Sequence, residues 1–348
     1  MISATPAPAT AEPLPITPTS LPLHYNKRLM LFSGRANPGL AQAIGARLGV
    51  ELGPVTLKTF SNDEVYCRYE ESIRGADVFI VQPMCGNPAT GINANDALLE
   101  LLVMIDAAVG ASAHRVIAVT PWYGYSRQDK KSAPREPISA RLVARMLESA
   151  GVDRVLTMDL HAGQLQGFFQ VPVDHMTALM MLAQHFTDRP RGGDLVVVAP
   201  DAGRVKLNKQ FADRIGADLA ILDKERPRQQ VAEIGHVIGD VRGKTAILVD
   251  DIIDTAGTLR AGAEAVRRAG ARSICAAATH AVLSGNAFEN LAAAPLEEIV
   301  VTDTIPLRAG APDSIRVVSC AELLSDSIRR IFTDDSVSEV FGGKNHVF

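Results

Sequence analysis

The chain has 348 residues, a formal net charge of −4 and a sequence pI near 6.1, and 47% of its residues are hydrophobic. This length and apolar content suit two domains of ordinary size and exclude global disorder. The acidic balance argues against nucleic acid as the main partner, because proteins that bind nucleic acid carry a basic excess.

The first 26 residues are rich in proline, and no Lys or Arg occurs among the first 23. Such a segment cannot form a helix and lacks the positive charge of a targeting peptide, so we expect residues 1–26 to be a disordered tail. The four cysteines show no metal-binding or disulfide spacing, and no apolar run is long enough to cross a membrane. We therefore expect a cytoplasmic protein with no membrane partner.

From residue 28 onward, short β-branched runs alternate with stretches of helical period, which is typical of parallel α/β layering. Runs this apolar belong to strands that are buried on both faces. Their number exceeds one small sheet, so we predict two similar α/β halves that meet near residue 180. The predicted strands are 28–34, 76–83, 115–121, 154–161, 195–201, 219–225, 245–251 and 297–303, and the predicted helices include 95–111, 138–151 and 205–216.

Several predicted strands end in an acid or a histidine. In open α/β sheets, ligands bind beyond the carboxyl ends of the strands, so these side chains should share one rim. Structural capping is the alternative for one or two of them. The residues are Asp159, His161, Asp201, Asp223, Asp250, Asp251 and Asp303.

The stretch "LVDDIIDTAGTL" at 248–259 is the most informative. An isoprenoid-type DDxxD magnesium site would need its acids on a helix, whereas here an apolar strand runs into the acid pair. A small-residue loop and a helical pattern follow, which is the geometry of a phosphate cradle. The near-Walker sequence "GDVRGKT" at 239–245 lacks one residue and precedes a strand, so a turn explains it.

The loop can hold a phosphate while the acids accept hydrogen bonds from vicinal hydroxyls, and a phosphate with a diol indicates a sugar phosphate. This stretch resembles the ribose-phosphate motif of the phosphoribosyltransferase fold. The resemblance assigns ribose 5-phosphate to Asp250, Asp251, Asp254, Thr255, Ala256, Gly257 and Thr258.

Four further stretches extend the resemblance, over about residues 28–341, to the ribose-phosphate pyrophosphokinase family: "FSNDE" (60–64), "YGYSRQDKK" (123–131), "MDLHAGQLQGFF" (158–169) with "APDAG" (199–203), and "DKERPRQQVAE" (223–233). From the residues alone, each stretch has an ordinary alternative. Phe60 could be a buried aromatic ring, the cations of 123–131 could be solvated, His161 could be structural, and 223–233 could be a mobile surface loop. The resemblance instead implies ATP binding by Phe60, Asn62, Asp63, Glu64, Arg127 and Gln128.

The resemblance also implies a magnesium site at His161 and Asp201, and a catalytic loop in which Lys224 and Arg226 meet the transferring group. Magnesium prefers oxygen ligands, so His161 would act partly through water or the ATP phosphates. Arg226 would contact ribose 5-phosphate as well. Gln230 departs from the Asn found in many relatives and keeps an amide.

The implied activity is transfer of the diphosphoryl group of Mg-ATP to the anomeric hydroxyl of ribose 5-phosphate, with AMP released, in a homohexamer. Both implied domains are phosphoribosyltransferase-like. The N-terminal domain spans 27–180 and is joined by the C-terminal segment 333–348, and the C-terminal domain spans 181–332. A base-specific phosphoribosyltransferase and a non-catalytic regulatory relative are the alternatives.

Regulated relatives bind phosphate or ADP at an anion site between subunits. This chain matches that pattern at Ser72, Arg74, Lys131, Arg135, Ser336 and Ser338. Gly163 and Glu339 depart from it, which predicts weak regulation by phosphate and ADP.

Overall fold

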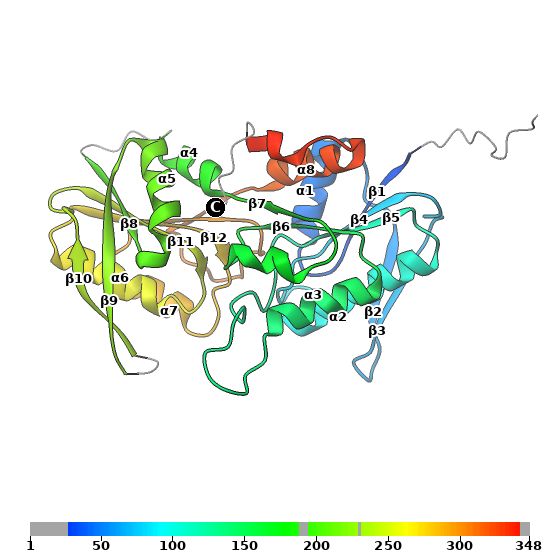
Figure 1. Cartoon of the computed structure of the whole chain (residues 1–348), viewed down its shortest axis with the longest axis horizontal. Coiled ribbons are helices and arrows are strands. Elements are labelled where there is room, and N and C mark those ends of the chain that lie inside the picture. The colour runs from blue at the N-terminus through cyan, green and yellow to red at the C-terminus, as the bar shows by residue number, and fades with distance from the viewer. Residues whose placement is uncertain (1–26, 188–193, 229–230, 342–348) are drawn as a thin grey trace, which may run out of the picture.

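The computed structural model describes residues 27–187, 194–228 and 231–341. It contains two α/β halves side by side, each built on its own sheet (Figure 1). Within the described residues, no helix combines the length and the apolar character that a membrane span requires.

The first sheet is entirely parallel and has the order β1-β4-β5-β6-β7. Parallel strands need crossover connections, and helices supply most of them. A separate antiparallel hairpin of two strands projects from this half (Figure 1). The bounds are β1 Leu29–Ser33, α1 Pro38–Leu48, β2 Val55–Thr59, β3 Val65–Tyr69, β4 Asp77–Val81, α2 Ala94–Gly110, β5 Arg115–Val119, α3 Ser139–Ala150, β6 Arg154–Met158 and β7 Val173–Met176.

The second sheet has the order β10-β9-β8-β11-β12-β13-β14 and is parallel except for β10. Its central strands are buried along most of their length, as their apolar sequences predict. The bounds are α4 Leu179–Thr187, β8 Leu195–Ala199, α5 Val205–Ile215, β9 Asp218–Arg228, β10 Val231–Ile238, β11 Thr245–Ile253, α6 Gly257–Arg268, β12 Ser273–Ala281, α7 Ala287–Ala293, β13 Glu298–Thr302, β14 Ile315–Val318 and α8 Ala321–Thr333.

All eight predicted strands and the three predicted helices are present, with ends that shift by a few residues. The predicted list missed the β2–β3 hairpin, whose partly polar strands lack a continuous apolar run. It also missed β7, β10, β12 and β14. In β12, "SICAAATHA" reads as helical because of its alanines, yet burial on both sides keeps it extended.

The two halves share one hydrophobic core, so they are not independently packed. Ile117 and Leu156 of the first sheet belong to the same cluster as Val197 and Ile247 of the second. Helix α8 returns to pack against α1 of the first half, and Arg115 Nη1 lies 2.9 Å from the carboxylate of Asp334, just beyond α8. The returning segment thus includes α8 itself, while the predicted domain boundaries at 180 and 333 stay predictions.

Two sequence interpretations change in the fold. Residues 223–233 are not a loop throughout, because β9 continues to Arg228 and pairs antiparallel with β10, forming a ribbon that extends past the sheet (Figure 1). Asp303 does not join the rim. It accepts a hydrogen bond from the Cys320 backbone amide, 2.7 Å away, and so holds the start of α8.

Candidate active site

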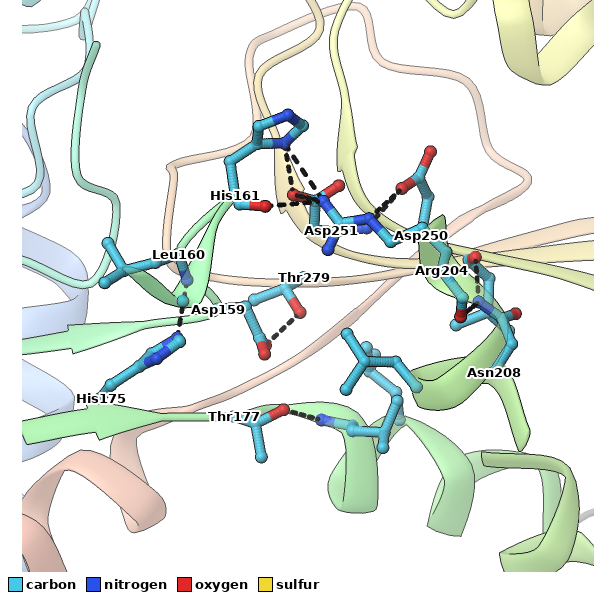
Figure 2. Close-up of a pocket in the computed structure, with 15 residues that line it drawn as sticks. Asp159, Leu160, His161, His175, Thr177, Arg204, Asn208, Asp250, Asp251 and Thr279 are labelled. Atoms are coloured by element: carbon cyan, nitrogen blue, oxygen red, sulfur yellow. Dashed lines mark hydrogen bonds and ion pairs between the residues drawn. The ribbon is translucent and has the colours of Figure 1, made fainter. Parts of the chain in front are cut away.

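The centre of the candidate site lies where the end of β6 in the first half meets the end of β11 in the second (Figure 2). His161 Nδ1 lies 2.8 Å from Asp251 Oδ2, although the two residues are 90 positions apart in the sequence. An ionised carboxylate only accepts hydrogen bonds, so the Asp251 contact favours the tautomer with the proton on Nδ1 and Nε2 available to a metal, although Arg204 Nη2 also lies 3.1 Å from Nδ1. The predicted convergence of strand-end residues is therefore correct for this pair.

Arg204 completes this centre and was missed by the sequence interpretation. Its Nη2 donates to the Asp251 carboxylate and, at 3.2 Å, to the His161 carbonyl, while its Nε lies 3.8 Å from Asp250 (Figure 2). Asn208 accompanies it by donating to the Arg204 carbonyl at 3.0 Å. The available signal was a cation just after the "APDAG" strand end, beside a rim rich in acids.

The two neighbouring acids differ in their pKa values. Burial alone would raise the pKa of Asp251, but the His161 hydrogen bond and the Arg204 charge outweigh it and hold the pKa well below the ordinary value. Burial and the Asp251 charge raise the pKa of Asp250 well above its ordinary value. About a third of the Asp250 side chain is exposed, 36%, so solvent moderates this rise. Asp251 is thus ionised and accepts hydrogen bonds, while Asp250 is protonated more readily than an ordinary aspartate.

The small-residue loop forms the other wall of a cavity of about 310 Å³. Ala256 adopts a left-handed conformation with φ of 60°, and helix α6 starts at Gly257, so backbone amides point into the cavity from a helix N-terminus. The predicted ribose 5-phosphate residues of this half come together here: the cavity is lined by Asp250, Asp251, Asp254, Thr255, Ala256, Gly257 and Thr258.

Asp254 is tied to both halves of the molecule. Its Oδ2 lies 2.7 Å from Arg127 Nη1, which comes from the loop after β5, and it also accepts from the Ser284 hydroxyl. Gln128, the next residue, instead accepts a hydrogen bond from Ser139 at 2.6 Å. Of the two predicted ATP residues in this loop, only Arg127 lines the cavity.

Asp201 lines the same cavity as His161, so the two predicted magnesium ligands face one space. Among the described residues, no group of three or more His, Cys, Asp or Glu side chains forms a preassembled metal site. His161 with its Nδ1 fixed by a carboxylate presents Nε2 as a metal ligand commonly does. Two protein ligands suit magnesium that completes its shell with phosphate oxygens and water.

The "FSNDE" residues lie at the tip of the β2–β3 hairpin, away from the second sheet (Figure 1). Phe60 is 44% exposed, so the alternative in which it is a core residue is wrong. The Lys58 ammonium stands 4.9 Å from its ring centre. Asn62, Asp63 and Glu64 are exposed as well, and within one chain none of them lines the cavity.

Lys224 and Arg226 belong to the backbone of β9, and their side chains lie outside what the structure describes, as does Gln230. Leu222, two positions before Lys224, lines the cavity. The ribbon therefore leaves the sheet at the edge of the candidate site.

The candidate regulatory residues lie on three separate segments. Within the described residues, no hydrogen bond or ion pair joins one of these segments to another. The carbonyls of Ser72 and Arg74 accept from Arg28, Lys131 and Arg135 lie in the long loop after β5, and the Ser336 and Ser338 hydroxyls lie 2.8 Å apart.

The sheet order, the acid pair and the small-residue loop at a helix N-terminus define a sugar-phosphate-binding α/β enzyme of the phosphoribosyltransferase fold. Comparisons with known proteins then identify the family. Residues 29–151 match the family described as the N-terminal domain of ribose phosphate pyrophosphokinase, and residues 234–342 match the phosphoribosyl synthetase-associated domain.

The similarity extends over whole chains. A ribose-phosphate pyrophosphokinase from Caldanaerobacter subterraneus is 49% identical and covers 91% of this chain and 99% of its own length. The Nostoc enzyme of the same name is 48% identical over 94% of this chain and 97% of its own. The crystal structure of phosphoribosylpyrophosphate synthetase from Mycobacterium smegmatis has a TM-score of 0.81 and 42% identity, and covers 88% of this chain and 99% of that one. The chain belongs to the ribose-phosphate pyrophosphokinase family and is an enzyme of that class.

Proposed function

We propose that the cavity between His161 and the small-residue loop performs the reaction named by the family. The diphosphoryl group of ATP is transferred to the anomeric hydroxyl of ribose 5-phosphate, which gives 5-phosphoribosyl 1-diphosphate and AMP. The product feeds nucleotide, histidine and tryptophan biosynthesis. The observation that carries the proposal is the junction of the two halves at His161–Asp251 and Arg127–Asp254.

Ribose 5-phosphate binds along the loop. The backbone amides at the start of α6 and the hydroxyls of Thr255 and Thr258 donate to the 5′-phosphate, since both groups line the cavity. The carboxylates of Asp250 and Asp251 accept from the ribose hydroxyls. Asp251 suits this role because its lowered pKa keeps it ionised at neutral pH.

ATP lies on the side of the first half, with Arg127 directed toward its phosphates. Magnesium would be held by Asp201 and His161 together with phosphate oxygens, and when bound it neutralises charge on the diphosphoryl group. Transfer of this kind depends on in-line positioning and charge neutralisation more than on covalent help. Lys224 and Arg226 on the β9–β10 ribbon supply cations to the transferring group and its leaving oxygen.

The hairpin bearing Phe60 and Glu64 is exposed and does not reach the cavity of its own chain. We propose that it completes the adenine site of a neighbouring copy, which makes the active enzyme a homo-oligomer, as in the homohexamer that the family resemblance implies. The net acidic charge and the described helices are consistent with a cytoplasmic enzyme.

The test is AMP formation from ATP in the presence of magnesium, with and without ribose 5-phosphate. We expect AMP only when both the sugar phosphate and magnesium are present, and none after chelation with EDTA. A base-specific phosphoribosyltransferase would instead consume 5-phosphoribosyl 1-diphosphate when given a nucleobase. Absence of AMP from a folded, oligomeric sample would favour the non-catalytic alternative.

A further inference from the structure

A second hydrogen bond joins the two halves directly beside the His161–Asp251 contact. The Thr279 hydroxyl donates to Asp159 Oδ2 over 2.6 Å (Figure 2). In the β11–β12 ladder, Asp250 pairs with Ala278 and Ile252 pairs with His280, which places Asp251 beside Thr279. Asp159 and His161, two positions apart on one segment, therefore meet two neighbouring residues of the opposite sheet.

Asp159 is held firmly from its own half as well. Its Oδ2 accepts from the Ala178 backbone amide at 2.8 Å, and its backbone adopts a φ of 33°, which is unusual for a residue with a side chain. The second half holds the same segment through His280 of β12, whose Nε2 lies 3.2 Å from the Met158 carbonyl and 3.3 Å from that of Asp159. Since Thr279 and His280 are almost fully buried, solvent does not compete for these bonds.

These residues do not line the sugar-phosphate cavity. Asp159 and Thr279 line a smaller, adjoining cavity of about 80 Å³, and His161, Arg204, Asp250 and Asp251 border both spaces. Thr279 therefore does not contact a substrate bound in the sugar-phosphate cavity. Any effect of Thr279 on the reaction has to act through the segment that carries His161.

We propose that Thr279 and Asp159 form a positioning latch that fixes His161 against Asp251 across the two halves. The latch is needed because His161 and Asp251 belong to different sheets, so a small shift between the halves would separate them. Catalysis is sensitive to such misplacement of a contacting group. The catalytic consequence of the latch rests on the proposed function, whereas its effect on the His161 segment does not.

The experiment compares three variants of the full-length enzyme. Thr279→Val removes the hydroxyl at nearly constant volume, and Thr279→Ser restores it. Thr157→Val is the matched control. Thr157 lies on β6, the strand that leads into Asp159 and His161, it is as buried as Thr279, and its hydroxyl has no partner in the described structure. Steady-state AMP formation and hydrogen–deuterium exchange of residues 158–163 are measured for each.

For Thr279→Val we expect kcat to fall about tenfold while KM for ribose 5-phosphate stays within about twofold, since the sugar cavity is untouched. Exchange across 158–163 should quicken about tenfold, because one of its tethers to the second half is lost. Thr279→Ser should return both quantities to within about threefold of the wild type, and Thr157→Val should match the wild type.

Equal losses in Thr279→Val and Thr279→Ser, or a kcat within about twofold of wild type in Thr279→Val, would overturn the latch. Unchanged exchange at 158–163 would do the same. If Thr279→Val fails to fold, Thr279→Ala is measured against the same criteria. A wild-type enzyme that makes no AMP would refute the proposed function alone, because the exchange measurement still decides whether the latch exists.

Discussion

Replacement of Arg204 by methionine tests the charge arrangement at the centre of the site. Methionine keeps much of the aliphatic bulk but removes the cation that faces Asp250 and Asp251. The side chains of Arg204 and Asp251 are only 16% and 9% exposed, so water compensates poorly for the loss. The variant leaves Asp251 paired with His161, while Asp250 keeps only the hydrogen bond from the Asp251 backbone amide among the described contacts.

The size of the effect follows from the geometry. At the 3.8 Å that separates Arg204 Nε from Asp250, an effective dielectric constant of 20 gives an attraction of about 4 kcal/mol before desolvation. Breaking a buried pair commonly costs about 3–5 kcal/mol, and partial exposure of Asp250 lowers this figure. We expect the free energy of unfolding to fall by about 3 kcal/mol at pH 8.

The loss should depend on pH. Asp250 has a raised pKa in the folded state, so the folded protein binds this proton more tightly than the unfolded chain does. Its contribution to stability is therefore present at low pH and is lost as the pH rises through the folded pKa. Without Arg204 the pKa of Asp250 rises further, so the penalty should shrink by about 1 kcal/mol or more at pH 5.

The assay is urea denaturation at pH 5 and pH 8, followed by fluorescence of Trp122, the single tryptophan. Arg127→Met is the control, since it breaks a similar ion pair whose side chains are 51% and 21% exposed and should cost less than about 1 kcal/mol. A loss below about 1 kcal/mol for Arg204→Met, or one that is equal at both pH values, would show that Arg204 does not stabilise the acid pair by its charge.

Three further outcomes are expected at the active site and one at the C-terminal segment that carries Glu339. Asp254→Asn should raise KM for ribose 5-phosphate about tenfold and leave the magnesium dependence at saturating substrate little changed, and a magnesium shift with unaltered sugar affinity would revive a metal role for Asp254. Lys224→Ala should lower kcat about a hundredfold with sugar binding nearly intact, which turnover within about threefold of wild type would contradict. Ala256→Gly should raise the free energy of unfolding by about 0.5–1 kcal/mol in thermal or urea denaturation, because glycine adopts the left-handed conformation at that position without strain. Arg330 already pairs with Glu339 at 2.7 Å, so the expected weak activation by inorganic phosphate rests on Gly163, and Glu339→Gln should change the initial rates by less than about twofold; strong activation of the wild type would contradict the expectation.

The ribose-phosphate loop could be predicted because all of its parts are contiguous. A buried strand, an acid pair, small residues and a helix follow one another between residues 245 and 268, and the structure contains them in that order. Local sequence dictates such a unit, since burial on both faces selects an apolar strand and a helix N-terminus selects the turn. The segment 239–245 was predicted to be a turn and not a Walker loop. In the structure Gly239 and Gly243 have positive φ, and Lys244 pairs with Asp218.

The alternation of strands and helices, the phosphate loop and the family resemblance could all be inferred from the sequence. The contacts between residues of the two halves became visible only in the three-dimensional fold. His161 with Asp251, Thr279 with Asp159 and Arg127 with Asp254 are each separated by 90 or more positions, and nothing local to either partner specifies the other. Arg204 shows the reason: on its own segment it is an ordinary cation at a helix start, and it becomes part of the site only because the shared core brings two sheets together.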